Sequence, residues 1–229
     1  MKLGNFYEDQ GGFENFIAEV SEGFDRPMST AYAFCKRTMD VGGSLVGLAL
    51  VVPLLPFIAM MIKLETSGPI LFRQSRVGER GRLFHCYKFR SMAMDAEDRK
   101  AELDHLNEAN GAAFKIKNDP RITRVGRFLR RSSLDEFPQL WNVLVGDMSI
   151  VGPRPQIPSE VEEYSREQAR RLVARPGLTC LWQVSGRSQL DFDEWMALDQ
   201  EYVQRRSLAY DIGLLLRTLP AVIERKGAY

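Results

Sequence analysis

The sequence predicts a mainly helical α+β fold, and three observations support this fold class. A run of 22 uncharged, mostly apolar residues occupies positions 41–62. Two short aromatic and apolar runs at 70–74 and 84–89 enclose a glycine-containing polar loop, which is the pattern of a β-hairpin. Several other segments repeat apolar residues at helical spacing. With 229 residues, the chain is long enough to bury a substantial core.

Composition and charge exclude several classes of protein. The chain is 45% hydrophobic and 27% charged with a net charge of +1, so nothing in it indicates a nucleic-acid partner. Its three cysteines, Cys35, Cys86 and Cys180, form no CxxC pair, so we expect reduced thiols in a cytosolic setting rather than disulfides or a zinc site. Residues 1–40 carry four basic and seven acidic side chains, and this acidic start predicts no signal peptide.

The first expected element is an amphipathic helix within residues 13–24. Its polar face carries three glutamates, which anionic lipid would repel, so the sequence favours docking of this helix onto the protein itself. The apolar residues at helical spacing are Phe13, Phe16, Ile17, Val20 and Phe24.

The uncharged segment 41–62 is next, and it is as long as a membrane-spanning helix, which needs about 20 apolar residues. Pro53 lies at its centre and removes a backbone donor, so a helix must kink or break there. Basic residues lie near both ends, which favours two ends on the cytoplasmic side. The residues alone leave three alternatives open: a re-entrant helix, a kinked spanning helix, and a buried hairpin in a soluble core.

The predicted hairpin ends in the sequence KFRSM. Lys88 and Arg90 lie two residues apart there, and therefore on one face if the chain is extended. The following stretch, 95–112, is highly charged and predicts a solvated helix or loop, to which we assign no chemistry.

A second amphipathic helix is predicted around residues 124–131. Arg124, Arg127 and Arg131 recur at helical spacing, and we expect Val125, Phe128 and Leu129 on the opposite side. Two interpretations stay open. The helix is either a solvated surface helix or one that lies at lipid headgroups with its arginines reaching phosphates.

Paired carboxylates follow at Asp135 and Glu136. Ser133 and Glu136 fit a capping box, in which the glutamate would only satisfy a backbone donor. Pro138 favours a helix that begins near position 138 instead, with both carboxylates at its positive end, where ionised forms are favoured. An ionised carboxylate is what a nucleophile or a magnesium ligand requires. Spacing alone leaves capping and catalysis open.

The C-terminal part offers one further candidate and two helices. Arg154 lies between two prolines, so a stiff loop presents its guanidinium in a way that suits a phosphate, although a plain turn is the alternative. The stretch 192–223 predicts two amphipathic helices. The second contains Asp211 and Arg217, which favours an interfacial or packed helix over a spanning one.

Together these motifs resemble those of the bacterial sugar transferases, the monotopic phosphoglycosyltransferases that prime polysaccharide assembly on a polyprenyl phosphate. The resemblance extends from about residue 35 to 229, and it is greatest to the small exopolysaccharide-priming members. One departure is Cys180, where the family commonly has glycine. The matching motifs are KRTMDVGGSLVGLALVVPLLPFIAMMIKL, GPILFRQSRVG, YKFRSM, SSLDEFPQLWNVLVGDMSIVGPRP and RPGLTCLWQVSGR.

The resemblance implies a fold and a reaction. It implies three parts: an extension at 1–34, a re-entrant helix–break–helix at 35–63 with the break at Pro53, and a cytosolic catalytic domain at 64–229. It also implies transfer of a sugar-1-phosphate, galactose or glucose, from a UDP-sugar to undecaprenyl phosphate with release of UMP. The expected location is the cytoplasmic face of the bacterial inner membrane, in contact with membrane lipids.

The resemblance further implies residue roles. Asp135 is the expected covalent nucleophile and Glu136 the expected ligand of Mg²⁺. Arg130 and Arg154 match positions that handle phosphate, and we add Lys88 and Arg90 as further phosphate-binding candidates.

Two rival functions are considered. One is direct glycosyl transfer that releases UDP, and the other is a non-catalytic protein of the membrane surface. The sequence leaves open the sugar, the polysaccharide, the role of residues 1–34, and whether the protein is a monomer or a homodimer.

Overall fold

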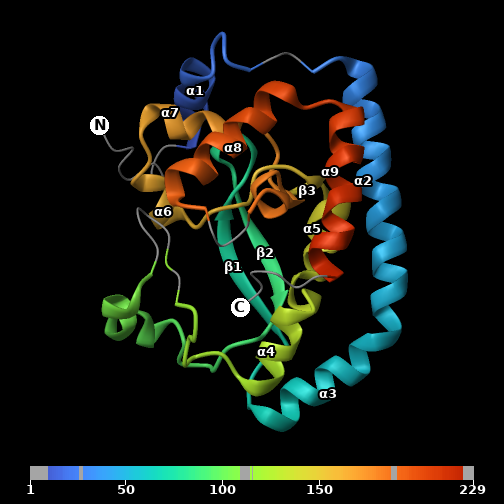
Figure 1. Cartoon of the computed structure of the whole chain (residues 1–229), viewed down its shortest axis with the longest axis vertical. Helices are drawn as coiled ribbons and strands as arrows, with labels where there is room; N and C mark the ends of the chain where they lie inside the picture. Colours follow the sequence, from blue (N-terminus) through green and yellow to red (C-terminus); the bar gives the residue numbers. More distant parts are fainter. Residues whose placement is uncertain (1–9, 26–27, 109–113, 115, 187–189, 224–229) are drawn as a thin grey trace.

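The computed structural model describes residues 10–25, 28–108, 114, 116–186 and 190–223 (Figure 1). These residues are mostly helical, with two small sheets, as the α+β prediction requires. The helices are α1 (Gln10–Val20), α2 (Thr30–Val51), α3 (Leu55–Glu65), α4 (Arg124–Arg131), α5 (Gln139–Val145), α6 (Pro158–Glu162), α7 (Arg166–Ala169), α8 (Phe192–Arg205) and α9 (Leu208–Ile223). Short 3-10 helices are η1 (Val52–Leu54), η2 (Glu79–Gly81), η3 (Asp98–Leu106), η4 (Leu134–Glu136), η5 (Arg170–Val173) and η6 (Trp182–Val184).

The first sheet is the predicted hairpin. Strand β1 (Leu71–Val77) pairs antiparallel with β2 (Leu83–Phe89), with Leu71 opposite Phe89 and Val77 opposite Leu83. The second sheet is a short parallel pair, β3 (Ser149–Val151) and β4 (Gly177–Thr179). Downstream of the hairpin, η3 occupies part of the charged stretch 95–112, and residues 109–112 of that stretch lie outside the described residues.

Helix α1 docks onto the protein, as its acidic polar face predicts. Phe13, Ile17 and Val20 are buried in the largest apolar cluster, together with residues of α6, η5 and α8. The helix ends at Val20, earlier than the predicted pattern, and Phe24 packs against the same cluster from the turn that follows.

Helices α2 and α3 form one long segment that is broken at the central proline. Pro53 lies in η1, between the two helices, and α3 turns away from the direction of α2 and passes beneath α4 (Figure 1). The helical segment Thr30–Glu65 is long and apolar enough to cross a membrane by length and composition. Helix α2 begins at Thr30, five residues before the boundary at 35 that the sequence suggests.

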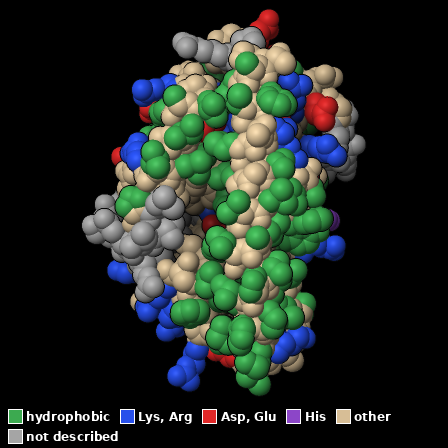
Figure 2. All heavy atoms as spheres, turned by 90° about the vertical axis from the view of Figure 1, so that its right-hand side faces the viewer, with side chains coloured by type: hydrophobic (Ala, Val, Ile, Leu, Met, Phe, Trp, Pro, Cys, Tyr) green, Lys and Arg blue, Asp and Glu red, His purple; other side chains and the backbone are tan. Residues whose placement is uncertain are grey.

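The outward side of this segment is apolar. Figure 2 shows this side of the molecule, where hydrophobic side chains lie along α2 and gather at the lower end, around α3. Helices α5 and α9 add further exposed apolar side chains. The largest exposed apolar residues of the segment are Phe34, Leu45, Val46, Leu50, Val52, Leu54, Leu55, Phe57, Met60 and Leu64.

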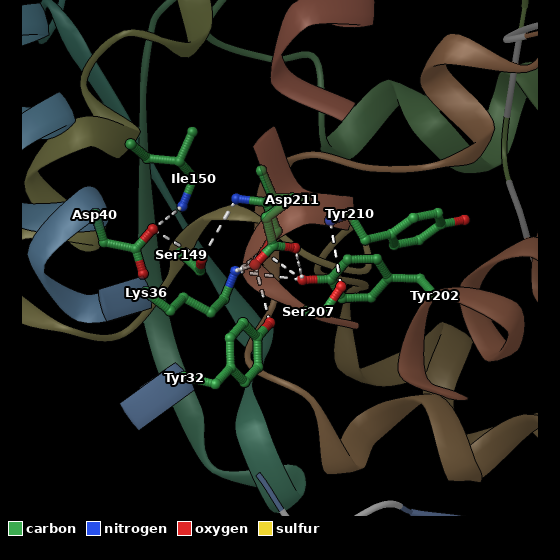
Figure 3. Close-up of polar contacts among 10 residues, drawn as sticks. Tyr32, Lys36, Asp40, Ser149, Ile150, Tyr202, Ser207, Tyr210 and Asp211 are labelled. Atoms are coloured by element: carbon green, nitrogen blue, oxygen red, sulfur yellow. Dashed lines mark hydrogen bonds and ion pairs between the residues drawn. The ribbon is translucent and has the colours of Figure 1, made fainter. Parts of the chain in front are cut away.

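Polar side chains attach α2 to the rest of the protein. The buried Asp40 carboxylate accepts hydrogen bonds from the Ser149 hydroxyl and the Ile150 N–H, both at 2.9 Å. A second group, which we call the anchor cluster, consists of Tyr32 and Lys36 of α2, Tyr202 of α8 and Asp211 of α9. In Figure 3 the other three side chains point toward the Asp211 carboxylate. Lys36 Nζ lies 2.8 Å from Asp211 Oδ2.

Apolar contacts attach α3. Ile58 and Ile62 are buried against Phe89 at the end of the hairpin and Leu129 of α4. The Glu65 carboxylate at the end of α3 accepts the Arg124 and Val125 N–H groups, at 2.6 and 2.8 Å, and so caps the start of α4. Both halves of the broken helix are therefore attached to the same domain.

Candidate active site

Helix α4 comes directly before the turn that holds the paired carboxylates. The Thr123 hydroxyl caps the N-terminus of α4 by accepting the Gly126 N–H at 2.9 Å. Leu129 lies fully buried on the inner face of the helix. After the helix ends, Ser133 has a left-handed backbone, with φ 56° and ψ 14°. For a residue other than glycine this conformation costs about 1–3 kcal/mol, and such strain clusters at functional sites.

The capping-box alternative fails. The Ser133 side chain makes no cap hydrogen bond, and η4 carries Asp135 and Glu136 in a separate turn. Helix α5 then starts at Gln139 with Pro138 as its N-cap, as Pro138 predicts. The two carboxylates thus lie just before the N-terminus of α5, and neither is used to cap it by the predicted box.

Glu136 is held by two cations. Its Oε1 atom lies 2.8 Å from Lys88 Nζ of β2 and 3.0 Å from Arg154 Nη2. Burial alone would raise the pKa of this carboxyl, but the Lys88 ammonium and the Arg154 guanidinium outweigh it and hold the pKa far below its usual range. Glu136 is therefore a fixed negative charge.

Asp135 has a different environment. It is buried, with 8% of its surface exposed, and within the described part of the chain no salt bridge engages it. Burial, and then the neighbouring Glu136 charge, raise the pKa of the Asp135 carboxyl, against the opposing effects of Lys88, Arg130 and Arg154. Desolvation and the helix N-terminus therefore act in opposite directions on this carboxyl, and the expectation that Asp135 is ionised stays a prediction.

Arg130 joins this group from α4. Its Nε donates to the Ser91 hydroxyl at 2.9 Å. Burial lowers the pKa of its guanidinium, while the negative charge of Asp135 acts in the opposite direction. The structure thus brings together five of the predicted residues, which are Lys88, Arg130, Asp135, Glu136 and Arg154.

Arg90 lies elsewhere. Its guanidinium donates to the carbonyls of Thr66 and Ser67, at 2.9 and 2.6 Å, and to the Thr66 hydroxyl at 2.8 Å. It therefore closes the C-terminal end of α3 and does not face the carboxylates. Because β2 ends at Phe89, the extended spacing that grouped Arg90 with Lys88 does not continue to position 90.

Phe128 also departs from the prediction. Its side chain is 54% exposed, and together with Arg124, Arg127 and Arg131 it lines a surface hollow of about 250 Å³. The apolar side of α4 is formed by Val125 and Leu129 instead. The exposed face of α4 is therefore cationic with one aromatic ring.

Sequence reasoning missed three residues behind Arg154. Arg76 donates to the Pro155 carbonyl at 3.0 Å, and Arg171, paired with Asp199, donates to the Arg154 carbonyl at 2.7 Å. Arg76 stands in the FRQSRVG motif, which could have indicated it. No local pattern indicates Arg171 or Asp199, since their partners lie far away in sequence.

The chemistry available at this site is that of anion handling. Asp135 is a buried carboxylate that no described residue pairs with in a salt bridge. Three basic side chains lie near it, one each from β2, α4 and the 153–156 loop. Such an arrangement can stabilise charge on a phosphate group while a carboxylate attacks it.

Comparisons with known proteins agree with this class of site. The family description "Bacterial sugar transferase" matches residues 31–225, so the chain belongs to the bacterial sugar transferase family. It is 46% identical over 200 residues to the undecaprenyl-phosphate galactose phosphotransferase of Salmonella typhimurium, covering 86% of this chain and 42% of that protein. It is 39% identical over 218 residues to the exopolysaccharide production protein ExoY of Rhizobium meliloti, covering 93% and 95%.

A third relative is the UDP-glucose:undecaprenyl-phosphate glucose-1-phosphate transferase of Caulobacter vibrioides. The chain is 43% identical to it over 203 residues, which cover 85% of this chain and 72% of that protein. The chain spans less than half the length of several relatives that it matches.

Proposed function

We propose that this protein is a phosphoglycosyltransferase that moves a sugar-1-phosphate from a UDP-sugar to undecaprenyl phosphate and releases UMP. The names of the relatives support this reaction, with galactose or glucose as the sugar and exopolysaccharide synthesis as the process. The site provides independent support. The observation that carries the proposal is the buried Asp135, which forms no salt bridge with the described residues, beside a Glu136 that Lys88 and Arg154 hold in place.

The reaction proceeds in two displacements. An Asp135 carboxylate oxygen attacks the phosphorus that bears the sugar, a P–O bond forms, and the bond to UMP breaks with its electron pair leaving on UMP. A phosphate oxygen of undecaprenyl phosphate then attacks the same phosphorus and displaces the Asp135 carboxylate. Splitting the transfer in this way lets a soluble and a lipid substrate be used in turn.

The basic residues have a defined task in both displacements. A carboxylate that attacks a pyrophosphate brings anions together, so fixed positive charge must offset the repulsion. Lys88 and Arg154 already contact Glu136, next to Asp135, and Arg130 approaches from α4. We assign phosphate binding to Lys88, Arg130 and Arg154, and we assign Arg90 a structural role at the end of α3.

The donor set fits Mg²⁺. The part of the chain that the structure describes contains no group of three or more metal-binding side chains. Magnesium, however, commonly takes one or two carboxylates and completes its octahedron with water and substrate phosphates. Asp135 and Glu136 are such a pair, and the two cations that hold Glu136 both contact Oε1. We assign Glu136 as the main protein ligand. When bound there, Mg²⁺ would neutralise charge on the pyrophosphate oxygens.

We further propose that the segment Thr30–Glu65 enters the bilayer from the cytoplasmic face of the inner membrane and returns to it. Asp40 and the anchor cluster hold α2 on the domain, and Ile58 and Ile62 hold α3 on the same domain. A straight spanning helix would have to give up one of these two sets of contacts. The exposed apolar side chains between them suit the hydrocarbon region.

The reaction is tested with a panel of UDP-sugars and undecaprenyl phosphate in lipid nanodiscs, with the nucleotide product identified by chromatography. We expect UMP with UDP-galactose or UDP-glucose, and none with the Asp135→Asn variant. UDP as the product would favour direct glycosyl transfer. Absence of any nucleotide product, with membrane binding intact, would favour a non-catalytic surface protein.

Topology is tested separately by cysteine labelling of sites before residue 30 and after residue 65 in intact and permeabilised cells. We expect labelling only after permeabilisation for both sites. Labelling of either site from outside would exclude the re-entrant arrangement. The variant Pro53→Leu should shift the segment toward a spanning helix, because it restores a backbone donor at the break.

A further inference from the structure

The loop that carries Arg154 is braced from outside along its whole length. The carbonyls of residues 153, 154, 155 and 156 each accept a hydrogen bond from a different residue. The donors are, in that order, the Gly177 N–H at 2.8 Å, Arg171 Nη2 at 2.7 Å, Arg76 Nη1 at 3.0 Å and the Val77 N–H at 2.9 Å. Two of these donors are backbone groups of the strands, and two are arginine side chains.

The brace on Arg154 itself comes from a buried ion pair. Arg171 of η5 is 1% exposed, and its Nε and Nη2 atoms donate to Asp199 Oδ2 of α8 at 2.9 and 2.5 Å. Its Nη1 atom donates to the Tyr164 hydroxyl at 3.1 Å. The guanidinium is thereby fixed in direction, and the same Nη2 atom reaches the Arg154 carbonyl.

This pair is a costly way to stabilise a core. Removing two charges from water costs several kcal/mol per ion, and packed apolar side chains are often as stabilising as a buried pair. Within the described residues, Asp199 Oδ1 is buried without a hydrogen-bond partner. Burial, opposed by the Arg171 charge, raises the pKa of the Asp199 carboxyl to about 6. Stability alone therefore does not account for this pair.

We propose that Arg171, held by Asp199, is a positioning residue that fixes the Arg154 backbone so that the Arg154 guanidinium stays on Glu136 during phosphate transfer. This inference rests on the proposed function and deepens it. A carbonyl that shifts would displace the guanidinium at the other end of the same residue. Misplacement of a catalytic group by about 1 Å can cost 100-fold in rate.

The test compares Arg171→Lys with Arg170→Lys. Arg170 is the adjacent residue, and its Nε donates to the Val20 carbonyl of α1, away from Asp135 and Glu136, so it is a matched control. A lysine at 171 keeps the charge beside Asp199 but loses the fork that reaches both Asp199 and the Arg154 carbonyl. We expect a kcat about 10- to 100-fold lower for Arg171→Lys. The KM for the UDP-sugar and the Tm should stay close to wild type, and Arg170→Lys should transfer at the wild-type rate.

A double-mutant cycle separates positioning from general destabilisation. In an Arg154→Ala background there is no guanidinium left to position, so Arg171→Lys should have almost no further effect on kcat. If the fold-reductions in kcat of the two single variants multiply in the double variant, the proposal is overturned. A double variant, Arg171→Met with Asp199→Leu, replaces the pair by apolar side chains and guards against simple unfolding. It should melt near the wild-type temperature and still show the lowered kcat, and wild-type kcat in this folded variant would also overturn the proposal.

A structural readout keeps the inference independent of the reaction. If the wild-type protein releases no UMP from any UDP-sugar, the proposed function fails, and crystal structures of the two lysine variants still decide the positioning claim. We expect the contact between Arg154 and Glu136 to be lost in Arg171→Lys and kept in Arg170→Lys. A retained contact in Arg171→Lys refutes the positioning role.

Discussion

In the anchor cluster, the Asp211 carboxylate accepts hydrogen bonds from Tyr32, Lys36 and Tyr202 at 2.8 to 2.9 Å. In the turn η4, by contrast, no salt bridge from the described residues reaches Asp135. Both carboxylates are buried beside basic side chains. In the first region every charge has an internal partner. In the second, Lys88 and Arg154 pair with Glu136, and the described residues supply no salt bridge to Asp135.

This comparison distinguishes buried charges that hold the fold together from buried charges that are available to a ligand or a reaction. A charge whose partners are all internal can hold two helices together, because nothing has to be released for it to do so. A buried carboxylate without an internal partner costs free energy in the folded protein. A ligand or a reaction that brings a partner to it can recover part of that free energy. Substitution of Asp135 should therefore mainly lower activity, and substitution of Asp211 should mainly lower stability.

The largest expected effect is loss of the covalent step in Asp135→Asn. Wild-type enzyme mixed with UDP-sugar and no lipid acceptor should release UMP in an amount no greater than the enzyme present, since the phosphosugar stays on Asp135. The asparagine cannot attack, so this burst should fall by at least about 1,000-fold. Rapid-quench assays measure the burst, and mass spectrometry of the wild-type protein should locate a sugar phosphate on Asp135.

Asp211→Asn is the matched control for that experiment. It makes the same replacement of a carboxylate oxygen by an amide nitrogen at another buried aspartate, and its burst should persist under conditions where the variant remains folded. A kinetic pattern in which UMP appears only after both substrates have bound would contradict the covalent route.

Next in size is the effect of Glu136→Gln on magnesium dependence. The amide keeps the shape but removes the charge that pairs with Lys88 and Arg154 and that the proposed Mg²⁺ site needs. We expect the Mg²⁺ concentration for half-maximal rate to rise at least about 10-fold, because magnesium relies on charged oxygen ligands. Titration of Mg²⁺ in the steady-state assay measures this, and wild-type activity at low Mg²⁺ would mean that Glu136 is not the ligand.

A smaller expected effect concerns stability in the anchor cluster. Asp211→Asn leaves Lys36 without its counter-charge at a largely buried position, and breaking such a pair costs about 3–5 kcal/mol. Thermal unfolding in nanodiscs should show a clearly lower Tm. The control is Glu201→Gln, which removes the exposed pair with Arg205 and should cost under about 1 kcal/mol. Equal effects in the two variants would remove the distinction between the regions.

The smallest expected effect is a shift of the pH profile. Burial and Glu136 raise the pKa of Asp135, while the Lys88 ammonium lowers it. The attacking form is the carboxylate, so the burst should be present above this pKa and lost as pH falls through it. Lys88→Met removes the lowering effect and should move the acidic limb to higher pH. Lys63→Met, on the exposed end of α3, should leave the limb in place, and a limb that moves to lower pH in Lys88→Met contradicts the assignment.

Much of the fold was predictable because its signals are local. The helical spacing of Phe13, Ile17 and Val20, the break at Pro53, the hairpin and the helix after Pro138 are all properties of short stretches. Two errors arose where a local pattern was extended too far. Arg90 stands one residue past the end of β2. Phe128 lies four residues after Arg124, so helical spacing places it on the exposed arginine face of α4 in spite of its hydropathy.

The electrostatics of the site were less predictable. The dipole argument left out burial, which has the largest effect on the pKa of Asp135 and which only the packed structure reveals. Arg171 and Asp199 were missed for a related reason. They are 28 residues apart and meet only because η5 packs on α8.

The way in which α2 and α3 are attached has a practical consequence for handling the protein outside a membrane. Their inward contacts, through Asp40, the anchor cluster, Ile58 and Ile62, are made entirely to other parts of the chain. An extracting detergent therefore has to cover the outward apolar side chains. Mild micelles and nanodiscs should consequently preserve the same bent helix, and small-angle scattering on both preparations can compare the two envelopes.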